Sequence, residues 1–158
     1  MTQGDDIQVV VFRVGGQEFA FNIFHVQRIL RHEAPAPLPK APAFLEGVLQ
    51  VQGAVVPVID LRKRFELQAP QREETRTMVL EAEGLTVAVV VDAVVEVVRV
   101  AAGAVVAPPA VVRGLAAEYI QGIITLGSRT IILLQTGRLL TSAERIALEA
   151  VQGEAVHG

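Results

Sequence analysis

The sequence predicts a mostly β protein that contains two copies of one unit, and three observations lead to this prediction. Residues 44–61 have the pattern of a β-hairpin that returns 75 positions later at residues 119–135. A second hairpin pattern, with Gly16 in its turn, returns 68 positions later with Gly84. Hydrophobic residues make up 51% of the chain and aromatic residues only 4%, so the core is aliphatic. Its many valines favour strands, and short hydrophobic strands are best protected by closing into two small barrels packed side by side.

The first copy begins with strand-like runs at Ile7–Val14 and Phe19–Ile23 around a Gly15-Gly16 turn. In the segment that follows, residues 24–31, the apolar side chains stand at helical spacing. This spacing predicts a short helix or turn. Residues 33–42 contain four prolines, which remove amide donors, so we expect an extended surface connector there.

The hairpin at residues 44–61 consists of Val48–Val51 and Val55–Ile59 around Gly53-Ala54. Glycine at the first central position predicts a type II′ turn. Asp60 follows the second strand directly and is expected to cap a short helix over Leu61–Phe65.

The second copy follows a polar, proline-containing boundary at residues 66–75. We expect a single domain over residues 1–158, with a first barrel at 7–66 and a second at 76–140. Short helices are expected to connect the strands, and the capping-box sequence Thr141–Glu144 predicts a C-terminal helix over Arg145–Val151.

Several glycines are interpreted as structural, because strand ends and turns need backbone angles or close approaches that a Cβ atom resists. These are Gly16, Gly47, Gly53, Gly84 and Gly122.

Composition excludes several classes of function. The net charge is −3 and the basic residues are scattered, so no nucleic acid partner or anionic membrane surface is expected. The chain has no cysteine, and its acidic start is unlike a secretory signal, which favours a cytoplasmic protein. No apolar run reaches the roughly 18 residues that direct membrane insertion needs.

No residue pattern predicts catalysis, a metal site or a cofactor. The histidines His25, His32 and His157 lack a second ligand at metal-like spacing, and the glycines fit no phosphate-binding loop. An enzyme would require Asp60, Asp92 or a histidine to converge in a pocket with a perturbed pKa. Binding is therefore preferred, and the scarcity of aromatic residues favours aliphatic grooves for protein partners over aromatic platforms.

Motifs along the chain closely resemble those of the CheW family of chemotaxis coupling proteins. They are Val9–Phe12, Gly16, Phe19, Val26–Ile29, Phe44–Gly47, Val56–Arg62, Phe65 and Tyr119–Gly122, in the family's order, and the likeness covers about residues 7 to 150. The resemblance implies two five-stranded SH3-like barrels. It also implies a non-catalytic, cytoplasmic adaptor that connects the tips of methyl-accepting chemoreceptors to the regulatory domain of the histidine kinase CheA in a two-component system. A CheW-like scaffold for a different kinase pathway is the alternative.

The resemblance also implies where the partners bind. Receptor tips dock near the junction of the barrels in this family, which gives the candidates Val26, Arg28, Ile29, Leu30, Gln52 and Val98. The kinase is expected to contact exposed aliphatic residues at the hairpin ends, for which the candidates are Val48, Ala54, Val55, Leu126 and Ile131.

Three positions depart from the family's pattern. Gln52 replaces a characteristic arginine, Arg28 replaces the glutamate that usually pairs with it, and Gln135 replaces a common aspartate. We interpret Arg28 and Gln52 as a paired change in which the Gln52 amide oxygen accepts a hydrogen bond from Arg28. The groove would then carry an uncompensated positive charge that influences partner choice.

Overall fold

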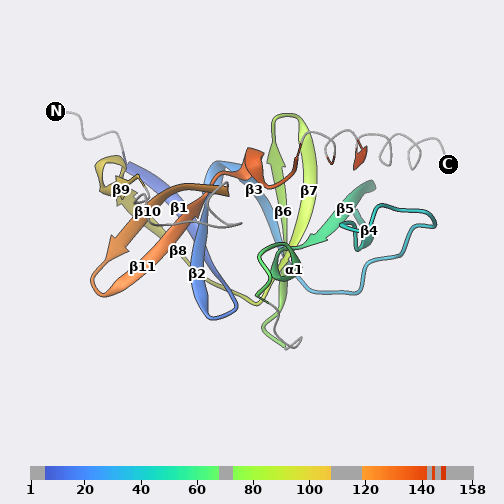
Figure 1. Ribbon diagram of the computed structural model, residues 1–158, viewed down its shortest axis with the longest axis horizontal. Coiled ribbons are helices and arrows are strands. Elements are labelled where there is room, and N and C mark those ends of the chain that lie inside the picture. Colours follow the sequence, from blue (N-terminus) through green and yellow to red (C-terminus); the bar gives the residue numbers. More distant parts are fainter. Residues whose placement is uncertain (1–5, 68–72, 108–118, 142–143, 145–146, 149–158) are drawn as a thin grey trace.

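The computed structural model describes residues 6–67, 73–107, 119–141, 144, 147 and 148. These residues form two curled β-sheets that lie side by side (Figure 1). The strands are β1 (Asp6–Val14), β2 (Gln17–Asn22), β3 (Val26–Arg31), β4 (Gly47–Val51), β5 (Ala54–Asp60), β6 (Arg76–Ala82), β7 (Leu85–Val91), β8 (Ala93–Ala101), β9 (Val105–Val106), β10 (Ile120–Leu126) and β11 (Arg129–Leu134). The helical segments are α1 (Leu61–Arg64) and the 3₁₀ turns η2 (Ile23–His25), η3 (Ala102–Ala104) and η5 (Thr136–Arg138).

Each sheet contains strands from both halves of the chain. Sheet A has the order β8-β1-β2-β11-β10-β9, and sheet B has the order β3-β6-β7-β5-β4. The opening hairpin of each copy, β1–β2 or β6–β7, therefore joins the remaining strands of the other copy. Parallel pairing of β2 with β11 and of β7 with β5 holds the exchanged hairpins in place. The expected barrel limits of residues 7–66 and 76–140 are wrong, because a strand's own pattern does not specify which strand pairs with it.

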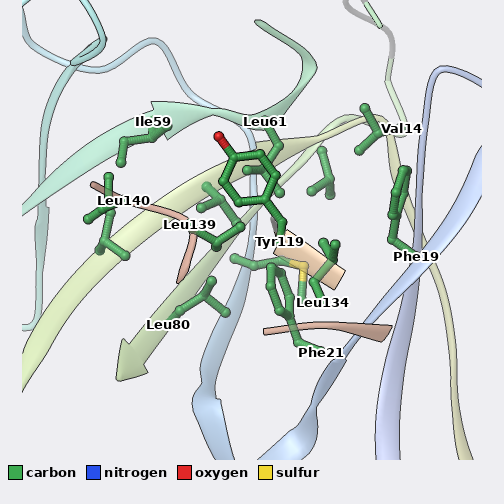
Figure 2. Packing of buried hydrophobic residues seen from close by; sticks show 14 of the residues in the cluster. Val14, Phe19, Phe21, Ile59, Leu61, Leu80, Tyr119, Leu134, Leu139 and Leu140 are labelled. Atoms are coloured by element: carbon green, nitrogen blue, oxygen red, sulfur yellow. The ribbon is translucent and has the colours of Figure 1, made fainter. Parts of the chain in front are cut away.

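The exchanged hairpins are apolar on both faces, and this explains their continuous hydrophobic runs. On β1, Val9 and Val11 pack inside sheet A, whereas Val10 and Phe12 face a core shared by the two sheets. Strand β6 repeats the arrangement, with Val79 inside sheet B and its neighbours in the shared core. Figure 2 shows the shared core, in which Phe21, Leu80 and Leu134 come from both sheets. Burial on both sides fixes the position of each hairpin between the two sheets.

Residues 24–31 do not form the expected short helix. They contain the end of η2 and strand β3, and the corresponding residues 92–99 lie mostly in β8. Strand β3 pairs with β6, and β8 pairs with β1. A helix of this length gains few backbone hydrogen bonds for the cost of its nucleus, so pairing with an adjacent hairpin prevails over apolar spacing.

The β4–β5 turn consists of Gln52-Gly53, one residue earlier than expected. Both residues have positive φ, 51° for Gln52 and 82° for Gly53, and Val51 pairs with Ala54. This is the type I′ pattern, so the expected type II′ turn at Gly53-Ala54 is wrong. Gly15-Gly16 and Glu83-Gly84 also have positive φ at both positions. The type I′ twist matches the right-handed twist of the strands that these turns connect.

Replacing Gly53 with valine should lower the free energy of unfolding by about 1 kcal/mol or more. A Cβ atom at Gly53 would meet no heavy atom within 4 Å, so the cost comes from holding a β-branched residue at φ 82°. Denaturant unfolding measures the change. Gly103→Val is the control, because a Cβ there also enters open space without a positive φ. Equal stabilities of the two variants would contradict the prediction.

Gly47 and Gly122 occupy equivalent positions outside the turns, where another chain segment passes close to the backbone. A Cβ on Gly47, whose φ is 150°, would overlap the carbonyl group of Ala36. A Cβ on Gly122 would overlap the side chain of Val105 in β9. Ala36 bridges Val48 much as β9 pairs with β10, so the proline-rich connector supplies the counterpart of β9.

Asp60 caps α1 as expected, and Leu61 and Phe65 are buried against the shared core. The predicted capping box is also present. The amide of Glu144 donates to Thr141 Oγ1 at 3.1 Å, and the amide of Thr141 donates to Glu144 Oε1 at 3.0 Å. Most of the C-terminal helix predicted over Arg145–Val151 lies outside the described residues.

Candidate protein-docking site

Sheet B has a hollow of about 690 Å³ at the end where the β4–β5 hairpin turns. Arg28 of β3 and Gln52 of the turn both line it, although they are 24 residues apart in the sequence. Val79 of β6 and Val56 of β5 contribute apolar surface from the cluster inside sheet B. The other lining residues are Gln27, Gln50, Val51, Gly53, Ala54, Val55 and Thr86.

The hollow carries a positive charge from Arg28. Within the described ranges of the chain, the side chain of Arg28 makes neither a hydrogen bond nor an ion pair. The neighbouring Gln27 Nε2 instead donates to Glu81 Oε1 at 2.8 Å. Arg28 and Gln52 therefore share one surface, as their interpretation as a pair requires, but the expected hydrogen bond between them is not formed.

The six receptor candidates do not gather in one groove. Val26 packs against the shared core, Leu30 against the cluster inside sheet B, and Val98 against the cluster inside sheet A. Ile29 is 42% exposed and pairs with Met78, a member of the shared core, so it lies on the face directed toward the junction of the sheets.

Val97 and Phe24 are exposed residues that the sequence analysis did not select. Val97 is 48% exposed and pairs with Val10, which places it on the corresponding face of β8. The 68-residue repeat relates Ile29 to Val97, and this relation is the sequence signal that could have identified Val97 in place of Val98. Phe24, in η2, is 87% exposed. The helix expected over residues 24–31 gave no reason to predict an exposed aromatic side chain there.

Among the five kinase candidates, Ala54 and Val55 lie at the hairpin end of sheet B. Val48 instead pairs with Pro57 and bridges Ala36, and Leu126 packs against the cluster inside sheet A. Ala54 is exposed and Val55 is partly buried, and both line the hollow of sheet B. Val48 and Leu126 are also partly buried. Ile131 is fully buried inside sheet A, so its selection as an exposed contact is wrong. Alternation along β11 directs its side chain inward, next to Leu133 of the same cluster.

Asp60 and Asp92 do converge, but around Arg62 in an arrangement that explains both carboxylates structurally. Asp60 accepts from the amide, Nε and Nη2 of Arg62, each at 2.9 Å. Asp92 lies 3.7 Å from Arg62 Nη1, and its Oδ2 accepts from the amide of Gly15 at 2.7 Å. The hydrogen bonds that Arg62 donates to Asp60 raise the pKa of Arg62. Nearby, burial lowers the pKa of His32, and the charge of Arg62 lowers it further. The cluster joins α1 to the β7–β8 connection.

The described residues contain no group of three or more histidine, aspartate or glutamate side chains suited to hold a metal ion. Nor does the described part of the chain contain a helix long and apolar enough to cross a membrane.

Two SH3-like barrels with accessible hairpin ends and exposed aliphatic residues on edge strands define a double-barrel scaffold of the protein-docking class. The chain belongs to the CheW family, because residues 8–144 match the model of the CheW-like domain.

Comparisons with individual proteins agree with this family. The chain is 30% identical to the chemotaxis protein CheW of Treponema pallidum over 89% of this chain and 85% of that protein. It is 32% identical to the CheW of Klebsiella aerogenes over 91% and 87% of the two chains, and 32% identical to the protein FrzA of Myxococcus xanthus over 87% of each. The crystal structure of the scaffolding protein TtCheW from Thermoanaerobacter tengcongensis matches with a TM-score of 0.78 and 27% identity, over 85% of this chain and 88% of that one. The expected mostly β, double-barrel fold is confirmed. The expected five strands per barrel hold for sheet B, whereas sheet A has six because β9 pairs with β10 at its edge.

Proposed function

We propose that this protein is a non-catalytic adaptor in the cytoplasm that couples the signalling tips of chemoreceptors to the regulatory domain of a CheA-type histidine kinase. The observation that carries the proposal is the match to the CheW-like domain over residues 8–144. Relatives of nearly the same length are named chemotaxis proteins, and the solved relative is named a scaffolding protein.

The exposed aliphatic residues support two docking surfaces. The receptor surface contains Ile29 and Val97, which occupy equivalent positions on β3 and β8 and face the junction of the sheets. The kinase surface contains Ala54 and Val55 at the hairpin end of sheet B. Val48 lies farther along β4, and Leu126 lies at the hairpin end of the other sheet. Ile131 is omitted because it is buried. Separate surfaces let the adaptor hold both partners at once.

A scaffold for a different kinase pathway is the second candidate. Arg28 and Gln52 depart from the family's usual pair, and one relative of comparable identity carries the name FrzA instead of CheW. Co-purification with the receptor signalling fragment and the kinase regulatory domain from the same organism distinguishes the two candidates. The chemotaxis adaptor is expected to retain both proteins together, and the alternative scaffold is expected to retain a kinase without a chemoreceptor.

Single substitutions should separate the two surfaces. Ile29→Glu is expected to abolish retention of the receptor fragment and leave kinase binding unchanged, because it places a charge on the apolar receptor surface. Ala54→Trp should have the opposite effect, because its bulk obstructs the hairpin end. A pull-down with each partner measures both. Val106→Glu and Ala102→Trp are controls at exposed positions outside the two surfaces. Loss of both partners in either test variant, with the fold intact, would contradict separate surfaces.

A further inference from the structure

The two barrels present equivalent ends with different side chains. In sheet A, Val11 pairs with Glu96 and Leu126 pairs with Arg129. In sheet B, the equivalent pairs are Val79 with Arg28 and Val51 with Ala54. The offsets of 68 and 75 residues that relate the two copies connect every one of these positions.

At the end of sheet A, Arg129 forms ion pairs with two glutamates of the same chain. Its Nε donates to Glu18 Oε1 at 3.0 Å, and its Nη1 donates to Glu96 Oε2 at 2.6 Å. These hydrogen bonds, the one to Glu96 first and the one to Glu18 second, raise the pKa of Arg129. The three side chains come from β2, β8 and β11, so they cross the end of the sheet above its apolar cluster.

Sheet B lacks this arrangement. Arg28 stands where sheet A has Glu96, Ala54 stands where it has Arg129, and Thr86 stands where it has Glu18. The internal ion pairs therefore have no counterpart, and the hollow of about 690 Å³ occupies this end. Arg28 remains without an ionic partner among the described residues, and Gln52, Ala54 and Val55 form the rim beside it.

We propose that the hollow of sheet B accepts an acidic side chain of the kinase regulatory domain, whose carboxylate binds Arg28 while flanking apolar residues cover Val55 and Ala54. This proposal rests on the proposed adaptor function and names the chemistry of its kinase contact. Charge complementarity requires an anion at Arg28. Continuity of the hollow with the hairpin-end surface assigns that anion to the kinase instead of the receptor, whose proposed surface lies at the junction of the sheets. An arginine fork holds a carboxylate through two parallel hydrogen bonds, and the surrounding glutamine and threonine side chains add neutral polar contacts.

Arg28→Gln tests the contact. The variant should bind the purified kinase regulatory domain about tenfold more weakly, the usual effect of losing a hydrogen bond to a charged group. Arg28→Lys should recover part of the affinity, because lysine keeps the charge but loses the fork. Arg31→Gln is the matched control, since it removes the same charge from an exposed position on the same strand. Binding by the wild type should also weaken with added salt more steeply than binding by Arg28→Gln.

A second variant introduces the three ion-pairing residues of sheet A at the equivalent positions of sheet B. Arg28→Glu, Ala54→Arg and Thr86→Glu together copy Glu96, Arg129 and Glu18 at their equivalent positions. The triple variant should fold, shown by a cooperative thermal transition, and should lose kinase binding at least as severely as Arg28→Gln.

The outcomes distinguish the inference from the function on which it rests. Unchanged kinase affinity in Arg28→Gln, or an equal loss in Arg31→Gln, overturns the carboxylate contact while leaving the adaptor function intact. Weaker binding of the receptor fragment with normal kinase binding overturns the assignment of the hollow to the kinase. A wild-type protein that binds neither partner overturns the adaptor function, and the inference with it.

Discussion

Replacing Asp60 with alanine is expected to lower the free energy of unfolding by about 3 kcal/mol, since the change removes a helix cap and one half of a buried ion pair. Asp60 and Arg62 are 7% and 9% exposed, and three hydrogen bonds of 2.9 Å join them. Without Asp60, the Arg62 guanidinium loses its two 2.9 Å hydrogen bonds to a carboxylate, and Asp92 lies farther away, at 3.7 Å. Equilibrium unfolding in denaturant measures the loss.

Two further variants separate the causes. Asp60→Asn retains an oxygen that can cap α1 but removes the charge, so its loss of stability should be smaller. Combining Asp60→Ala with Arg62→Met should be less destabilising than the sum of the two single changes, because the double variant removes both partners of the buried pair. Strict additivity would show that the ion pair contributes nothing beyond the separate side chains.

Gly47→Ala is expected to destabilise the protein by about 2 kcal/mol or more, from backbone strain and overlap with a rigid neighbour. The φ of Gly47 is 150°, and an added Cβ would overlap the carbonyl of Ala36. That carbonyl already accepts a hydrogen bond from the amide of Val48 at 2.9 Å, so moving it disturbs the bridge to β4. The thermal midpoint should fall clearly below that of the wild type.

Gly122→Ala provides the internal comparison at the equivalent position. Its Cβ would overlap a methyl carbon of the Val105 side chain, which a rotamer change can move, and would lie 3.2 Å from the carbonyl oxygen of Val106; its φ lies outside the positive region. The loss of stability should therefore be smaller than for Gly47→Ala. A larger loss at Gly122 would show that the side chain of Val105 is held more rigidly than the connector at Ala36.

The prediction of the candidate site from the sequence was partly successful, and its failures have a common cause. Arg28 and Gln52 were paired from a resemblance, and the structure places both on one hollow. Leu30, Val98 and Ile131 were also selected for docking, but they pack against or within the clusters inside the sheets. The identity of an aliphatic residue on a strand does not show whether its side chain faces the core or the solvent. Only strand pairing shows that Val97 points outward and Ile131 inward.

The sequence by itself determined the local features of this protein. The two-residue turns and the cap at Asp60 depend on backbone angles and hydrogen bonds between residues a few positions apart. Short stretches such as Glu83-Gly84, both at positive φ, are sufficient to specify these interactions. The β character of the chain follows from the strand-like runs between these turns, and the duplicated unit follows from the recurrence of the pattern 68 and 75 positions later.

Only the tertiary structure decided which strands became neighbours. Strand β2 pairs with β11 across more than a hundred residues, and β3 and β8 became strands because an exchanged hairpin lay beside each of them. Both faces of β1 and β6 are apolar, so their patterns fit either sheet until the rest of the chain is folded. The open end of sheet B depends on this exchange as well, because β3 brings Arg28 beside a hairpin from the other copy. Strand pairing and burial are non-local interactions, and their outcome is fixed by the packing of the whole chain.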